Sequence, residues 1–146
     1  MMIRYKPVEI LLIEDNKGDI GLIEEVFDEG KIRNKLHVAE DGEEAILFLR
    51  GKGKFSGSPR PDIIILDLNL PNKDGREVLR EIKEDENLNN IPVVVLTTSN
   101  AEKDILRAYD LHANAYITKP LDFNEFMKVV ESIESFWLEI VQLPTK

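Results

Sequence analysis

Three short apolar runs stand out along the chain, and polar turn residues follow each of them. They are Val8–Ile13, Ile63–Leu66 and Ile91–Leu96. Apolar runs of this length with little polar alternation are typical of strands buried on both faces, as in a parallel sheet covered by helices. The pattern therefore predicts a sheet at the centre of the molecule.

Weaker strand signals and helical periodicity fill the intervals between these runs. Lys35–Ala39 and Ala115–Thr118 are predicted as short strands. Helices are predicted at residues 20–27, 43–50, 74–86, 101–111 and 123–141, with Ser99 or Asn100 capping the fourth and Asp122 the last. The repeated strand–helix alternation predicts an α/β fold, a doubly wound five-stranded parallel sheet of flavodoxin-like order 2-1-3-4-5 with helices on both faces.

Composition narrows the class of protein. The 146 residues fit one domain, and the absence of cysteine excludes disulfides, thiolate metal sites and a cysteine nucleophile. The formal net charge of -9 argues against nonspecific binding of nucleic acid. No apolar run approaches the roughly 20 residues that span a bilayer. The stretch Gly51–Pro61 is rich in Gly, Ser and Pro, and we expect an exposed loop there.

Chemically active side chains follow the predicted strands at the points where the strands end. They are Glu14, Asp15, Asp67, Thr97 and Lys119. The carboxyl ends of parallel strands share one edge of the sheet, so we expect these residues to converge. Three converging carboxylates repel one another, and a hard divalent cation such as Mg²⁺ would compensate their charge.

Acids, a metal ion, a lysine and a hydroxyl around one point make a site for a phosphoryl group. A carboxylate can itself act as the nucleophile and form an aspartyl-phosphate. Asp67, at the end of the apolar run Ile63–Leu66, is the residue best placed for that role.

These motifs resemble those of the receiver domains of two-component response regulators, over roughly residues 8–138. The matching features are the pair Glu14-Asp15, Asp67 followed by Leu68-Asn69-Leu70-Pro71, Thr97 and the dipeptide Lys119-Pro120. Each feature alone is weak, whereas all of them in this order and spacing on an α/β chain are specific. The resemblance implies one receiver domain over residues 1–146, with a helical C-terminal tail to residue 143.

The resemblance implies a role for each matching residue. Asp67 would accept a phosphoryl group from a sensor histidine kinase. Asp15 would bind Mg²⁺ directly and Glu14 through water, and the backbone carbonyl of Asn69 would complete the protein ligands. Lys119 would pair with the phosphoryl oxygens.

A second set of residues is implied to report phosphorylation. Thr97 would move to the phosphoryl group, and Tyr116 would then turn inward. These movements would shift helix 4, strand 5 and helix 5 from one of two conformations to the other. Asn69 and Ser99 would tune the lifetime of the phosphate. The Lys119–Pro120 bond is expected to be cis. The chain departs from the family pattern with Glu14 in place of Asp, with Thr98, and with its longer loop at residues 51–61.

The implied protein is a cytoplasmic, stand-alone signalling phosphoacceptor and not an enzyme with its own substrate, and neither DNA nor membrane is a partner. It is similar to the small regulators of phytochrome-like histidine kinases. The apolar tail Phe136–Leu143 has two interpretations. It packs back on the sheet, or it is an exposed patch that docks a kinase or joins helix 4 and helix 5 in a homodimer.

Two other functions compete with this interpretation. A phosphatase of the haloacid dehalogenase type also uses a strand-end Asp, but it needs a second acid where this chain has Asn69. A pseudo-receiver would keep the fold without phosphorylation. The presence of Asp67, Thr97 and Lys119 together argues against it.

Overall fold

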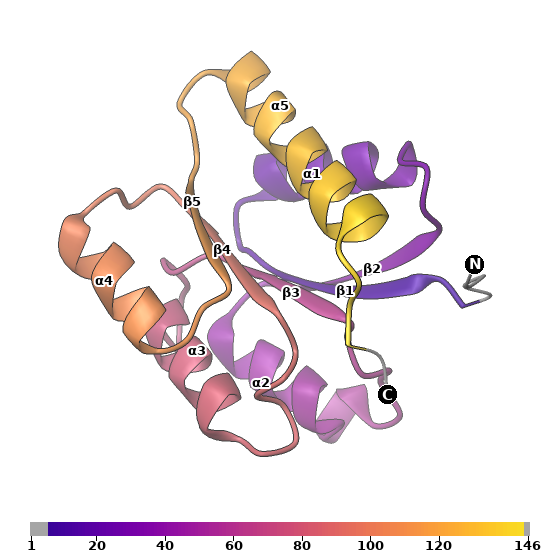
Figure 1. Ribbon diagram of the computed structural model, residues 1–146. Helices are drawn as coiled ribbons and strands as arrows, with labels where there is room; N and C mark the ends of the chain where they lie inside the picture. Colours follow the sequence, from indigo (N-terminus) through magenta and orange to yellow (C-terminus); the bar gives the residue numbers. More distant parts are fainter. Residues whose placement is uncertain (1–5, 145–146) are drawn as a thin grey trace.

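The computed structural model describes residues 6–144. Its centre is a parallel sheet of order β2-β1-β3-β4-β5, which confirms the predicted topology (Figure 1). The strands are β1 Val8–Ile13, β2 Asn34–Ala39, β3 Ile63–Leu66, β4 Val93–Thr97 and β5 Ala115–Thr118. Strands β1 and β3, which are followed by Glu14-Asp15 and by Asp67, are direct neighbours in the sheet.

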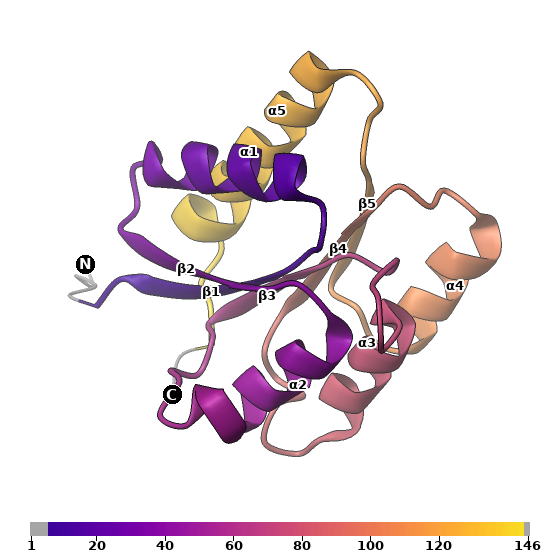
Figure 2. The ribbon, with the colours of Figure 1, turned by 180° about the vertical axis from the view of Figure 1, so that it is seen from behind.

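Helices cover both faces of the sheet (Figures 1 and 2). They are α1 Lys17–Asp28, α2 Gly42–Arg50, α3 Gly75–Glu84, α4 Glu102–Asp110 and α5 Phe123–Ile133, with a 3₁₀ turn at Gly53–Phe55 (η1) and a π-helical segment at Glu134–Ile140 (η2). Helices α1 and α5 lie on one face, and α2 and α3 lie on the other. This is the two-faced covering that the apolar runs predicted.

Successive residues of β3 explain why its sequence is apolar without interruption. Ile63 and Ile65 belong to the core under α1 and α5, whereas Ile64 and Leu66 belong to the core under α2 and α3. All four side chains are buried. A strand with a core on each side has no solvent face, so polar residues are excluded until the strand ends.

The start of α4 differs from the prediction. The N-cap is Ala101, which makes no side-chain capping bond, so the prediction that Ser99 or Asn100 caps this helix is wrong. The hydroxyl of Ser99 instead contacts a carboxylate in the first turn of α4. The cap at Asp122 is confirmed, because its carboxylate accepts the backbone N–H of Glu125 at 3.0 Å.

The C-terminal tail combines the two interpretations drawn from its sequence. Helical structure ends at Ile140 rather than at residue 143, because Val141 takes an extended conformation. Leu138 is buried, and Trp137 packs against the core under α1 and α5. Phe136 and Ile140 remain 51% and 67% exposed. The tail therefore folds back on the domain and still presents apolar side chains to solvent.

Within residues 6–144, no helix has the length and the apolar character needed to cross a membrane.

Candidate functional site

Backbone hydrogen bonds between strand ends hold the predicted site residues in place. The N–H of Glu14 donates to the carbonyl of Ala39 (3.0 Å), and that of Asp67 to Ile13 (3.0 Å). The N–H of Lys119 donates to the carbonyl of Thr97 (2.7 Å). The ladder of the sheet thus continues one residue past each strand, and it fixes the backbone from which the functional side chains project.

Three carboxylates meet at this edge. Glu14, Asp15 and Asp67 each offer an oxygen, and the three atoms lie within 4.8 Å of one another. Glu14 and Asp67 are buried, whereas Asp15 is exposed. Clustered carboxylate oxygens with one solvent-facing member suit a hard divalent cation that keeps part of its water shell. The predicted acid cluster is therefore present and forms a divalent metal site.

Lys119 lies against this cluster. Its side chain is 5% exposed, and its Nζ donates to Glu14, to Oδ2 of Asp19 at 2.8 Å and to Oδ2 of Asp67 at 3.4 Å. Asp19 was not foreseen as a site residue. The signal was available, because Asp19 lies in the first turn of the helix that follows the acidic pair.

Burial and charge act in opposite directions on these groups. Burial raises the pKa of Glu14 to about 7, although the hydrogen bond from Lys119 lowers it. Burial alone would lower the pKa of Lys119, but its hydrogen bonds to Asp19 and Glu14 outweigh that effect and raise it. Lys119 therefore stays charged, and it is shared by more carboxylates than it can neutralise. The excess negative charge favours a bound cation.

The backbone after β3 shapes the surroundings of Asp67. The N–H of Asn69 donates to Oδ1 of Asp67 at 3.2 Å. The Asn69 amide reaches toward the hydroxyls of Thr97 and Thr98, at 3.5 Å from each. Thr97 is fully buried, so β4 presents its hydroxyl to the site from within the sheet. These contacts place Asn69 against Asp67, and Thr97 against the side chain of Asn69.

The loop after β4 is tied to two helices by a polar network. The hydroxyl of Tyr116 donates to the backbone carbonyl of Ser99 at 2.8 Å, and the Ser99 hydroxyl donates to Asp104 at 2.6 Å. Arg76, at the start of α3, binds Asp104 in turn. The network links Ser99, which is implied to tune the lifetime of the phosphate, to Tyr116, which is implied to turn inward on phosphorylation. Sequence reasoning missed Arg76 and Asp104, whose pairing depends on how α3 packs beside α4.

The prediction of a cis peptide bond before Pro120 is wrong. The peptide bonds of residues 6–144 are all trans. The two isomers before proline differ by only about 0.5–1 kcal/mol, with trans favoured, so a cis bond requires surroundings that select it. Lys119 already reaches its three carboxylates with the trans bond.

The fold and the site together define a class of protein. It is a doubly wound α/β domain whose sheet carries, at its carboxyl edge, a metal-binding acid cluster, a buried lysine and a hydroxyl. Such a set of groups stabilises a phosphoryl group, and one of the acids can accept it.

Comparison with known proteins names the family within this class. Residues 10–131 match the response regulator receiver domain. Response regulator Rcp1 of a Synechocystis species is 51% identical over 138 residues, which are 94% of either chain. The chain belongs to the response regulator receiver domain family, and the sequence-based identification is confirmed. It is a signalling phosphoacceptor of a two-component system and not an enzyme with a separate substrate.

Solved structures of relatives agree with this assignment. The Mn²⁺-bound form of Rcp1 superposes with a TM-score of 0.94, covering 95% of this chain and all of that chain at 51% identity. The phosphorylated cyanobacterial phytochrome response regulator RcpA gives a TM-score of 0.93 at 48% identity, covering 96% of this chain and all of that one.

Proposed function

We propose that Asp67 is the phosphoacceptor and that the reaction takes place in the cytoplasm. One observation carries the proposal: the buried Asp67 carboxylate accepts a hydrogen bond from Lys119 and shares one acid cluster with Glu14 and Asp15. A carboxylate oxygen of Asp67 attacks the phosphorus of a phosphohistidine on the kinase. The bond from phosphorus to the histidine nitrogen breaks, and an acyl phosphate forms on Asp67.

The surrounding residues each have a proposed part. Asp15 and Asp67 would hold Mg²⁺ directly, Glu14 would act through water, and the carbonyl of Asn69 would complete the protein ligands. The metal ion, when bound, neutralises the phosphoryl oxygens. Lys119 donates to a phosphoryl oxygen. The mixed exposure of the acid cluster, with Asp15 toward solvent, supports this division of roles.

The same residues would transmit the signal. Phosphorylation adds about -1.5 to -2 charges beside Thr97. Its hydroxyl would donate to the phosphoryl group, and Tyr116 would turn inward as the loop after β4 moves. The bond from Tyr116 to the Ser99 carbonyl supports this coupling, because it ties β5 to that loop. Ser99 and Asn69 would set the lifetime of the phosphate, and α4, β5 and α5 would form the output face.

The kinase partner is proposed to be phytochrome-like. The support is the relative RcpA, which is described as a phytochrome response regulator and matches nearly the whole of this chain. The backbone of this chain superposes on that protein with a TM-score of 0.93. A kinase that docks on RcpA would thus meet a backbone of the same shape here.

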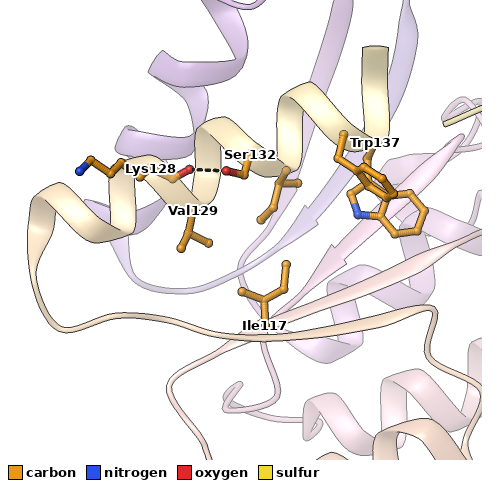
Figure 3. Close-up of a pocket in the computed structure, with 7 residues that line it drawn as sticks. Ile117, Lys128, Val129, Ser132 and Trp137 are labelled. Carbon is orange, nitrogen blue, oxygen red and sulfur yellow. Dashed lines mark hydrogen bonds between the residues drawn. The ribbon is translucent and has the colours of Figure 1, made fainter. Parts of the chain in front are cut away.

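A homodimer through α4, α5 and the tail is also proposed. An apolar groove of about 370 Å³ lies between β5 and α5, with Ile117, Val129, Ile133 and Trp137 on its walls (Figure 3). Phe136 stands edge-on to Trp137 at 5.6 Å between ring centroids and is half exposed at the groove. A groove and a projecting aromatic ring on one surface support a two-fold interface, in which the ring of each chain would enter the groove of the other.

Phosphotransfer can be tested without the kinase. Incubation with Mg²⁺ and acetyl phosphate should add one phosphoryl group, detected by intact mass, and Asp67→Asn should add none. An unmodified wild type, or an equal adduct on the variant, would contradict the proposal. Repeated turnover of a phosphate ester would indicate the phosphatase alternative.

A further inference from the structure

A second cavity lies at the opposite end of the molecule from Asp67, between the C-terminal half of α1 and the end of α5. Its volume is about 390 Å³. Leu22, Val26 and Met127 form an apolar wall, and carboxylates surround it. The sequence pattern gave no reason to expect a site there, because its residues come from two segments far apart in the sequence, residues 22–31 and 127–139.

Glu134 is the buried acid of this cavity. The residue is 6% exposed, and its Oε1 has no hydrogen-bond partner among the described residues. Gly30 provides the space for this carboxyl group, because a Cβ at position 30 would overlap with Oε1. A buried carboxylate oxygen without a donor is costly, so a ligand that donates a hydrogen bond to Oε1 would be stabilised here.

The charged groups facing Glu134 are mostly acidic. Glu25 and Glu29 approach from α1, and Glu131 and Glu139 from α5 and η2; Lys31 is the basic residue among those that line the cavity. Burial, a hydrogen bond shared with Glu139 and the charge of Glu139 raise the pKa of Glu134, although backbone N–H groups of Ile32 and Lys31 act against this. A cationic ligand beside Glu134 would oppose that rise, because it stabilises the charged carboxylate.

The carboxylates are too dispersed for one metal ion. Within the described chain, the group of three acids close enough to share an ion is the Asp67 cluster, and Glu134 is not part of such a group. The cavity instead places one acid deep inside, an apolar wall beside it and exposed acids at the rim. That order of features matches a ligand with a cation at each end and a hydrocarbon chain between them.

We propose that this cavity binds a linear alkyl diamine, with one ammonium on Glu134 and the other among the carboxylates of the rim. The inner ammonium donates to the unpartnered oxygen, and the methylene groups cover Leu22, Val26 and Met127. The bound diamine connects α1 to η2, so it stabilises the docking of the C-terminal segment. The site is separate from the phosphoryl site and does not depend on it.

Isothermal titration of the full chain with putrescine tests the proposal. We expect one saturable site, with release of protons detected as a dependence of the binding heat on the buffer. Glu134→Gln keeps the shape of the side chain and should weaken binding by about tenfold or more. Gly30→Ala should also weaken binding, because it displaces the carboxyl group without changing the charge. Glu86→Gln, an exposed acid after α3, is the charge-matched control and should bind as the wild type does.

Three results would overturn the proposal. The first is equal binding of putrescine to the Glu134→Gln and wild-type chains. The second is an equal response to butane-1,4-diol or to Mg²⁺, which would show that paired ammonium groups are not what the cavity selects. The third is tighter binding of an N-acetyl-lysine amide, which would assign the cavity to the side chain of another protein. Amide chemical shifts at Gly30 and Lys31 place the ligand independently of affinity.

Discussion

The guanidinium of Arg76 holds both carboxylate oxygens of Asp104. The Nε–Oδ1 and Nη2–Oδ2 distances are each 2.9 Å, and the pair joins the start of α3 to the first turn of α4. Asp104 also accepts the hydroxyl of Ser99, whose backbone carbonyl accepts the hydroxyl of Tyr116. Two-pronged arginine–carboxylate bonds fix orientation as well as distance. The loop through which phosphorylation is proposed to act is therefore held in place by this pair.

Asp104→Asn should make stability less dependent on acid pH. The hydrogen bonds from Arg76 and then Ser99 lower the pKa of Asp104 to about 2. A lowered pKa stabilises the fold above the ordinary value near 4, and this contribution is lost as pH falls from about 4 toward 2. At neutral pH we expect the variant to lose about 1 kcal/mol of unfolding free energy, reduced by partial exposure of the pair.

Urea denaturation at several pH values measures this effect. The difference between wild type and Asp104→Asn should shrink steadily as the pH falls below about 4. Asp110→Asn, at the exposed end of the same helix, should show no such trend. A constant difference at all pH values would mean that the carboxylate charge of Asp104 does not stabilise the fold.

Two glycine substitutions should have opposite effects. A Cβ at Gly75 would overlap with the backbone of Asp67 and Leu68, so Gly75→Ala should destabilise the fold by about 1–3 kcal/mol and displace Asp67, the proposed phosphoacceptor. A Cβ at Gly21, within α1, meets nothing within 4 Å. Gly21→Ala should stabilise by about 0.5–1 kcal/mol. Thermal unfolding measures the change in stability of both variants. Labelling with acetyl phosphate tests whether Gly75→Ala also displaces Asp67.

Asp15→Asn should weaken metal binding by about tenfold or more, because Asp15 belongs to the acid cluster and faces solvent. Asp19→Asn is the matched comparison, since Asp19 contacts Lys119 at 2.8 Å and lies outside that cluster. Its loss should change metal affinity much less. Titration with Mn²⁺ followed by electron paramagnetic resonance gives both values. Equal losses would indicate that net charge, and not ligation, governs binding.

Phe136→Glu and Ile140→Glu should weaken self-association, because both side chains are more than half exposed beside the apolar groove. They are better probes than Trp137, which also packs on the core. Sedimentation velocity with and without acetyl phosphate detects the change. Leu47→Glu, on α2 and on the other face of the sheet, is the control. A monomeric wild type at high concentration in both conditions would refute the dimer.

Local signals and distant contacts were predictable to different degrees. The strand at Ile63–Leu66 was visible because a strand buried on both faces must be apolar throughout, whereas β2 and β5 lie at the edges and gave a weak signal for the same reason. The convergence of Glu14, Asp67 and Lys119 followed from strand order alone. The cap of α4 was misplaced because Ser99 bonds to Asp104 in the first turn of α4 and leaves Ala101 as the N-cap.

The sequence by itself determined the sheet order and the identity of the acceptor edge. Apolar periodicity specifies which faces are buried, and parallel connections leave one edge for the strand ends. Only the tertiary structure decided that Asp19 shares Lys119, that Arg76 holds Asp104, and that Oε1 of Glu134 is buried beside Gly30 without a hydrogen-bond partner among the described residues. Those contacts depend on how whole helices pack against each other. No local pattern of residues encodes the distance between side chains on different helices.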